Sequence, residues 1–156
     1  MSRKRRSSQP LLRFAFLVYI ALMIWLLFGR TTGWVDGYTY EENLRMNVNF
    51  QPLFTIRNYL QVILRHTNEG ARSHCIINLV GNVIMFLPAG LLLPAIFPSH
   101  RNFLQFTVSC LAGILLIELI QLLTLLGSFD IDDVILNMFG LLIGYLAYTV
   151  THLRKK

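Results

Sequence analysis

Charged residues are scarce in this chain. Asp, Glu, Lys and Arg make up 14% of its 156 residues, whereas 54% are hydrophobic, a balance far from that of an ordinary soluble domain. A protein with so few charges does not surround one small core with a solvated polar surface. The length predicts a single domain, 1–156, and the composition places that domain in a membrane.

Several catalytic and nucleotide-binding motifs are also missing. Ser128 lies in "LGSFD", which is not G-x-S-x-G, and no phosphate-binding glycine loop is present. The histidines form no motif, and His74 is a candidate base only through its expected place beside the second apolar run. The sequence therefore contains no recognisable nucleophile motif.

Long apolar runs are what the chain has instead. Runs of roughly 17 to 24 residues can cross a hydrocarbon core about 30 Å thick. Four such runs lie at about 11–28, 76–97, 103–126 and 134–150. They predict an all-α polytopic membrane protein with four transmembrane helices and an outer loop, 29–75. The first run lacks an A-x-A-like cleavage site in "LLFGRTTG", so we interpret it as a retained anchor and not as a signal peptide.

The basic residues lie at the ends of the spans. They are not spread over a face with interleaved aromatics, so the net charge of +6 does not indicate a nucleic-acid partner. By the positive-inside rule, both tails and the turn around Arg101 are cytoplasmic. Five arginines in 29–75 weaken this orientation without reversing it. The two cysteines, Cys75 and Cys110, are expected at different depths, so no disulfide between them is predicted.

Part of the outer loop has helical periodicity. In "PLFTIRNYLQVILRH", apolar residues recur at helical spacing, while Arg57, Gln61 and Arg65 follow one another on another face. This pattern predicts an amphipathic surface helix from Pro52 onward. It either lies in the outer headgroup layer with its arginines on lipid phosphates, or caps the bundle without contacting a ligand.

Polar residues recur on single faces of the later spans. Asn78 and Asn82 share a face of the second span beside Gly81, and Pro88 and Pro94 predict a kink or break further along.

Glu118 and Gln121 share a face of the third span. An ionisable residue at such a position must face the bundle interior or water. In the fourth span, Asp133, Asn137, Gly140 and Gly144 form one stripe, whose G-x-x-x-G predicts a close helix contact.

Depth brings these faces together. At about 1.5 Å per residue, Asn78 and Asn137 lie roughly 3 to 5 Å below the outer boundary, Asn82 and Gln121 about 8 to 9 Å, and Glu118 about 12 Å. The sequence therefore predicts a polar pocket that opens outward beneath the turn 127–133. Asp130 is expected above the pocket, whereas Asp132 is expected to point away and to cap a helix N-terminus.

Three interpretations of this pocket stay open. Its oxygen ligands suit a divalent cation such as Mg²⁺, Ca²⁺ or Mn²⁺, held by Glu118, Asp130 and Asp133. Glu118 or Asp133 could instead be a general acid or base in catalysis. Alternatively, Glu118 is protonated, bonds to Asn82 or Asn137, and only locks the helices together. Whether the protein is an enzyme is not decided by the sequence.

Three blocks of the sequence, in this order and spacing, resemble the VanZ-like family of bacterial membrane proteins. They are "NLVGNVIMFLPAGLLLP", the pair Glu118 and Gln121, and "FDIDDVILNMFGLLIGY". The resemblance covers about residues 47–148. Its motif falls on Asn78, Gly81, Asn82, Pro88, Gly90, Glu118, Gln121, Asp130, Asp133, Asn137, Gly140 and Gly144. The basic residue that often precedes Ser-Phe-Asp in the family is missing from "LLGSFD", which puts a phosphate-binding role there in doubt.

The resemblance implies a multi-pass protein of the bacterial cytoplasmic membrane and a connection with teicoplanin resistance. Together with the pocket, it leads to one functional hypothesis: the pocket binds an envelope ligand and modulates glycopeptide susceptibility. Candidate partners are a membrane lipid headgroup, a lipid-linked cell-wall precursor or the glycopeptide. The alternatives are a metal-assisted intramembrane hydrolase or transferase acting on envelope lipids, and a purely structural or regulatory module.

Overall fold

The computed structural model describes residues 9–29, 33–65 and 68–153. Most of the charges in the two basic tails, and His66, lie outside these ranges. The described elements are α2 (Gln9–Phe28), α3 (Tyr40–Met46), β1 (Val48–Asn49), α4 (Phe54–Arg65), α5 (Glu69–Ile96), the 3-10 helix η1 (Pro98–Arg101), α6 (Phe103–Thr124), β2 (Phe129–Asp130) and α7 (Ile131–Leu153).

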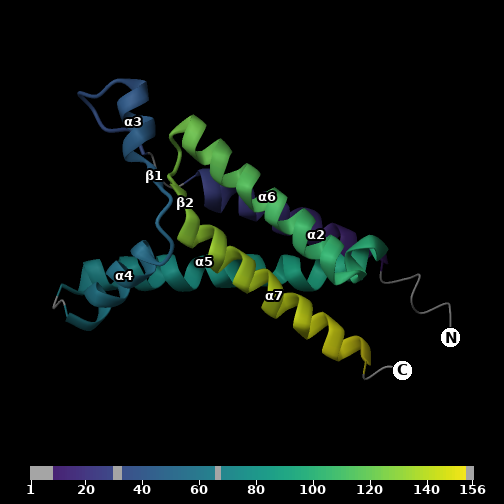
Figure 1. Ribbon diagram of the computed structural model, residues 1–156. Helices are drawn as coiled ribbons and strands as arrows, with labels where there is room; N and C mark the ends of the chain where they lie inside the picture. The colour runs from purple at the N-terminus through teal and green to yellow at the C-terminus, as the bar shows by residue number, and fades with distance from the viewer. Residues whose placement is uncertain (1–8, 30–32, 66–67, 154–156) are drawn as a thin grey trace.

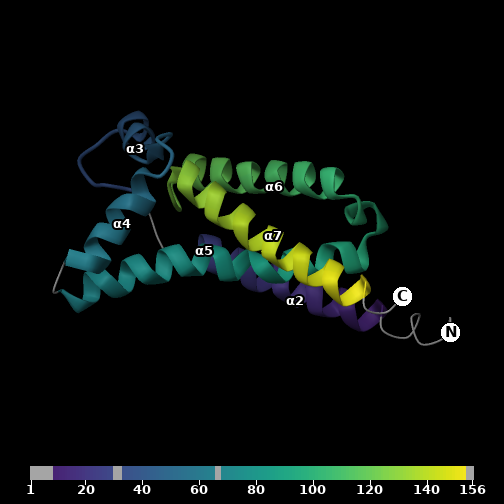
Figure 2. The ribbon, with the colours of Figure 1, turned by 60° about the horizontal axis from the view of Figure 1, so that its bottom comes forward.

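Four of the described helices are long and apolar enough to cross a membrane, namely α2, α5, α6 and α7. The start of α2, the turn η1 and the end of α7 lie at one end of the bundle, and α3, α4 and both strands lie at the other (Figure 1; Figure 2). The all-α fold with four spans is therefore as predicted. We call the end that carries α3 and α4 the loop end.

Helix α5 begins before the predicted second span. It starts at Glu69 after Asn68, whose side chain accepts a hydrogen bond from the backbone N–H of Ala71. Its 28 residues extend about 42 Å, which is more than the roughly 30 Å of a hydrocarbon core. The helix is therefore longer than one perpendicular span needs, and residues 69–75 are helical instead of belonging to a loop.

Of the predicted kink or break at Pro88 and Pro94, the break was wrong, because α5 runs through both prolines. A proline removes one backbone donor, and neighbouring groups in a membrane helix can satisfy the freed carbonyl. At the η1 end, Pro98 has no N–H to offer the carbonyl of Pro94. The Nε of Arg101 donates a hydrogen bond to that carbonyl at 3.3 Å instead.

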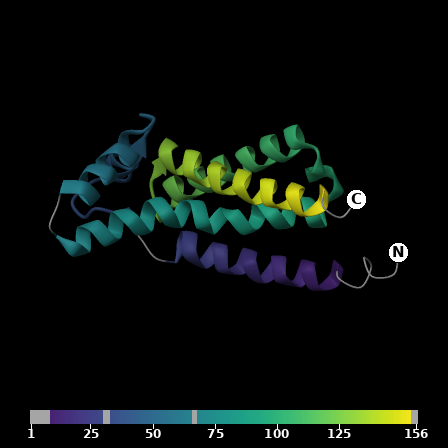
Figure 3. The ribbon, with the colours of Figure 1, turned by 90° about the horizontal axis from the view of Figure 1, so that it is seen from below.

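The most extensive helix contact joins α5 and α7, which cross with the same chain direction (Figure 3). A Cβ atom on Gly140 would collide with the carbonyl oxygen of Val83, and one on Gly144 with that of Leu87. From the other side, a Cβ on Gly90 would collide with the backbone of Leu141. The predicted close contact at the G-x-x-x-G therefore exists, and α5 is the partner helix.

The apolar core lies between α2, α5, α6 and α7. Its buried members are Met23, Phe86, Ala89, Phe106, Cys110, Ile114, Val134 and Leu141. Helix α2 contributes least, because only 6% of its most apolar 18-residue window is buried, against 33% for α7. Most of the α2 surface therefore remains free to face lipid.

Helix α3 and the two short strands at the loop end were not predicted. Strands β1 and β2 pair in parallel, with Val48 opposite Phe129 and Asn49 opposite Asp130.

Helix α4 packs against α5 through half-buried side chains such as Ile56 and Ile63, while Leu60 and Leu64 stay exposed. The amphipathic helix is thus confirmed, with one part of its apolar face on protein and another part open.

We expect Gly140→Ala to lower the thermal stability of the purified protein in detergent. The added methyl group must push α5 and α7 apart, and overpacking of this kind costs about 1–3 kcal/mol. The matched control is Gly113→Ala in α6, where a Cβ meets nothing within 4 Å. Equal melting temperatures for the two variants would contradict the close contact between α5 and α7.

Candidate functional site

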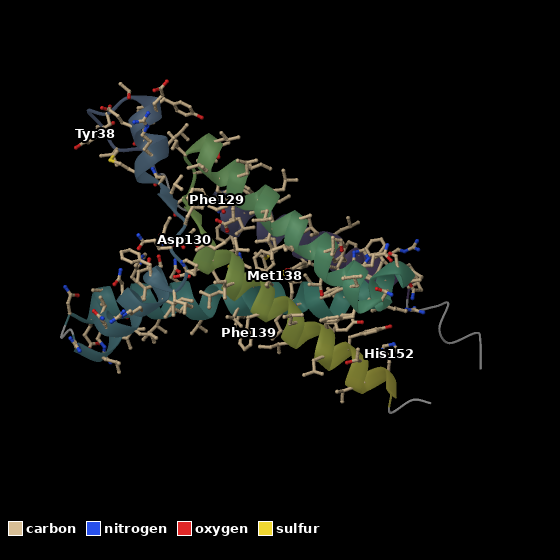
Figure 4. The ribbon with its side chains drawn as sticks, in the orientation of Figure 1. Tyr38, Phe129, Asp130, Met138, Phe139 and His152 are labelled. Carbon is tan, nitrogen blue, oxygen red and sulfur yellow. The ribbon has the colours of Figure 1, made fainter. Side chains whose placement is uncertain are left out.

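Asp130 ties the outer loop to the start of α7. It is 8% exposed and lies where β2 meets α7 (Figure 4). Its carboxylate accepts hydrogen bonds from the Nδ2 of Asn49 at 3.2 Å, the hydroxyl of Thr55 at 2.5 Å and the backbone N–H of Asp132 at 2.9 Å. Asp130 therefore caps α7 and binds both ends of the segment between β1 and α4.

Asp132 caps a helix, as expected, but the helix is α4 and not its own. Its two carboxylate oxygens accept from the backbone N–H groups of Leu53 at 2.5 Å and Ile56 at 3.0 Å. Leu53 has φ = 63°, a left-handed conformation that costs a non-glycine residue about 1 kcal/mol or more. The side chain of Asp132 is fully buried against the start of α4. It therefore points away from Asp133, whose partner is Asn82.

Glu118 lies beneath this junction. It is 3% exposed, and its Oε2 accepts from the backbone N–H of Asp130 at 3.4 Å. The carboxyl group also interacts electrostatically with those of Asp133 and Asp130. Glu118 of α6 is therefore close to the acidic residues where α7 begins.

A cavity of about 460 Å³ lies beside these carboxyl groups at the loop end, and we call it the polar cavity. Its wall contains the end of α2, the outer half of α5, the end of α6, and parts of the outer loop and of the turn 127–133. The residues that line it are Leu26, Leu27, Gly33, Asn47, His74, Ile77, Asn78, Gly81, Asn82, Met85, Gln121, Gly127, Ser128 and Asp133.

Four of the seven proposed ligand-binding residues line the polar cavity, namely Asn78, Asn82, Gln121 and Asp133. The Nδ2 of Asn82 donates a hydrogen bond to Asp133 at 2.5 Å. The Nε2 of Gln121 donates to the carbonyl of Leu27 at 2.9 Å, which ties the end of α6 to the end of α2. The other three, Glu118, Asp130 and Asn137, are buried and do not line it.

Two amide oxygens at this site have no hydrogen-bond partner. They are the Oδ1 atoms of Asn78 and Asn137, both buried. An unsatisfied buried acceptor costs about 1–3 kcal/mol, and such groups are rare in folded proteins. Asn78 also lines the polar cavity, although its Oδ1 atom is itself buried.

The half-buried Tyr59 of α4 adds an aromatic side chain near the site. Its ring contacts the ring of His74 edge-on, with centroids 6.2 Å apart. Burial, and then the negative charge of Asp133, raise the pKa of Tyr59. The hydroxyl therefore stays protonated at neutral pH and can donate a hydrogen bond.

The carboxyl groups divide into two sets by what they bind. Asp130 and Asp132 are occupied by backbone and side-chain donors of the protein itself. Asp133 alone combines a protein partner with a place in the cavity wall. Among residues 9–29, 33–65 and 68–153, no group of three or more His, Cys, Asp or Glu side chains is arranged to hold a metal ion.

Comparison with known proteins gives the family. A model of the VanZ/LLP1 family matches residues 16–152. The chain belongs to the VanZ/LLP1 family. Protein VanZ of Enterococcus faecium is 28% identical over 142 residues, which cover 89% of this chain and 75% of that protein. No solved structure matches. The resemblance seen in the three sequence blocks is thus confirmed over nearly the whole chain.

The VanZ/LLP1 motif positions have distinct structural roles in this chain. Asn78, Gly81, Asn82, Gln121 and Asp133 line the polar cavity. Gly90, Gly140 and Gly144 permit the close approach of α5 and α7. Glu118 and Asp130 are part of the junction that holds the outer loop.

Sequence reasoning missed the outer-loop residues of the VanZ/LLP1 site. Asn47 lines the cavity, and its Nδ2 donates to the carbonyls of Gly33 and Asn43. Asn49 and Thr55 donate to Asp130. Their one available signal was position, since all three lie within 47–148, the range that the family resemblance covers, although they belong to no catalytic or ligand motif.

We expect Asp132→Ala to release the start of α4. The change leaves the N–H groups of Leu53 and Ile56 without an acceptor, and hydrogen bonds to a charged group contribute about 1.5–3 kcal/mol each. Hydrogen–deuterium exchange should therefore become faster in peptides covering 53–65, with little change in α6. Glu41→Ala, at an exposed position of α3, is the control. Unchanged exchange in α4 would show that Asp132 does not hold it.

Proposed function

We propose that the polar cavity binds the uncharged, hydroxyl-bearing headgroup of an envelope lipid in the outer leaflet. The observation that carries this proposal is the wall of the cavity. Four of its polar side chains are amides, from Asn47, Asn78, Asn82 and Gln121, and Ser128 adds a hydroxyl. Amides offer donors and acceptors together, which matches the hydroxyl groups of a sugar or glycerol.

The charges at the cavity argue against a phosphate as the group bound deepest. None of the described residues in its wall is Lys or Arg, which are the side chains that phosphate sites use most. The carboxyl groups of Asp133 in the wall and Glu118 beside it would repel a phosphate when they are ionised. The missing basic residue before Ser128 agrees with this choice. In a lipid-linked cell-wall precursor, the sugar would therefore be the part recognised.

The orientation of the chain is part of the same proposal. The turn with Arg101 lies at the opposite end from the cavity (Figure 1), and the positive-inside rule places that turn in the cytoplasm. The tails, by their charge, belong on the same side. The polar cavity then opens toward the outer leaflet, where a glycopeptide meets its targets, and binding there would modulate susceptibility to teicoplanin.

The hydrogen bonds around Asp130 support the alternative that part of the family motif has a purely structural role. These bonds hold the outer loop and α4 over α7, so substitutions there act through folding. The cavity-lining residues Asn78 and Asp133 are the ones whose substitution should act through binding. An enzyme that hydrolyses or transfers lipid groups would convert the lipid that it binds, so product formation separates that alternative from binding.

We expect Asn78→Ala to weaken binding of a neutral glycolipid, glucosyl diacylglycerol, to the purified protein in detergent. Loss of one hydrogen bond of about 0.5–1.5 kcal/mol corresponds to a rise in Kd of roughly 2- to 12-fold. Native mass spectrometry measures the bound fraction, and Asn58→Ala on the exposed side of α4 is the matched control. Equal binding by both variants, or tighter binding of phosphatidylglycerol than of the glycolipid by the unaltered protein, would refute the proposed headgroup.

In cells, we expect Glu118→Gln, Asp133→Asn and Asn137→Ala each to change teicoplanin susceptibility toward that of a strain lacking the gene. The reason is that each alters the cavity wall or the groups directly behind it. The measurement is growth inhibition in a complemented deletion strain, with membrane protein levels determined in parallel. Wild-type susceptibility for all three variants at normal protein levels would refute a role for the cavity in resistance.

A further inference from the structure

A second cavity of about 370 Å³ lies deeper in the bundle, between α2, α5 and α6, and we call it the apolar cavity. On α2 its wall extends from Phe16 to Phe28, which is about 18 Å along the helix. One leaflet of a hydrocarbon core is roughly 15 Å deep. The apolar cavity is therefore as long as the chain region of one leaflet.

The polar groups in the wall of the apolar cavity already have partners. The hydroxyl of Tyr19 donates to the carbonyl of Met85 at 2.7 Å, and that of Ser109 donates to the carbonyl of Phe106 at 3.0 Å. His100 also lines this cavity, and its Nδ1 is hydrogen-bonded to the hydroxyl of Ser99 at 3.2 Å. The rest of the wall consists largely of side chains such as Met23, Phe86 and Ile117. A cavity of this kind favours hydrocarbon over water.

The two cavities adjoin each other. Leu27 at the end of α2 lines both, and the consecutive residues Met85 and Phe86 of α5 line the polar and the apolar cavity respectively. The unpartnered Oδ1 of Asn78 lies at the polar end. We call the two adjoining cavities along α2 and α5 the seam. The lining of the seam changes from polar to apolar along its length, as the structure of an amphiphile does.

We propose that one lipid molecule occupies both cavities, with its headgroup in the polar cavity and a hydrocarbon chain in the apolar cavity between α2, α5 and α6. This inference rests on the proposed headgroup site and specifies its ligand as an intact lipid. It excludes a free sugar or a soluble glycopeptide as the occupant of the seam. The exposed side of α2 borders the bilayer, so the lipid enters laterally.

Photo-crosslinking in phosphatidylcholine nanodiscs tests the inference. Two probes are needed, both glucosyl diacylglycerol, one with a diazirine on the sugar and the other with a diazirine in the middle of an acyl chain. We expect the sugar probe to label α5 around Asn78. The chain probe should label the inward side of α2, around Met23, and α6 at Gly113 and Ile117.

The substitution Gly113→Phe is designed to fill the part of the apolar cavity that the hydrocarbon chain of the lipid would occupy. Gly113 lines the apolar cavity, and a Cβ there meets nothing within 4 Å, so the ring extends into free space. We expect inward labelling by the chain probe to fall about tenfold or more because the ring fills the volume, while labelling by the sugar probe continues. Leu116→Phe, at a position of α6 that is 57% exposed, should change neither probe.

The outcomes separate the two proposals. No labelling of the cavity wall by the sugar probe in the unaltered protein overturns the headgroup site, and with it the bound lipid. Specific sugar labelling, with the chain probe only on outward positions such as Leu116, overturns the chain position and leaves the headgroup site standing. If Gly113→Phe fails to fold, the labelling pattern of the two probes on the unaltered protein decides alone.

Discussion

Hydrogen bonding at the first turn of α7 determines how the loop end of this protein is built. A membrane-embedded chain must satisfy its backbone polar groups internally, and the loop end contains irregular segments that no helix can satisfy. Asp130 and Asp132 do this by accepting bonds from the outer loop and from the start of α4. These two side chains act together with the pairing of β1 and β2 and the packing of α4 on α5 to fix β1 and α4 relative to the spans. The wall of the polar cavity depends on them, although neither residue lines it.

The same turn explains why adjacent aspartates have different roles. Successive side chains on a helix point in directions about 100° apart, so Asp132 and Asp133 cannot face the same partner. Asp132 turns toward α4, and Asp133 turns toward Asn82 and the cavity. One short acidic sequence thus serves structure with two of its carboxylates and the candidate site with the third. An acidic residue in the VanZ/LLP1 motif can therefore either hold the loop end together or line the candidate site, and its residue type alone does not tell which.

The helical periodicity of the sequence predicted the spans and the face of α7 shared by Asp133, Gly140 and Gly144, which meets α5. It also singled out Asn78, Asn82, Gln121 and Asp133, which line one cavity. These follow from local geometry and from the cost of polar groups in hydrocarbon. The partners of Asp130 and Asp132 could not be predicted in this way. Asn49 and Thr55 are about 80 residues away in the chain, and β1 is too short to have a pattern. Local propensity at Pro88 and Pro94 left a break of the second span open, and α5 is continuous there because helix packing outweighs that propensity.

The low burial of α2 means that the four spans are not held equally tightly in the bundle. Glycines hold α5 and α7 at a separation that leaves no room for sliding, whereas α2 contributes few buried side chains. Segments with few buried contacts open at the lowest free energy, so α2 is the span whose displacement costs least. The bundle therefore consists of a rigid part, α5 with α7, and a compliant wall on one side. That asymmetry gives any exchange of molecules between the interior and the bilayer a preferred direction, through the seam beside α2.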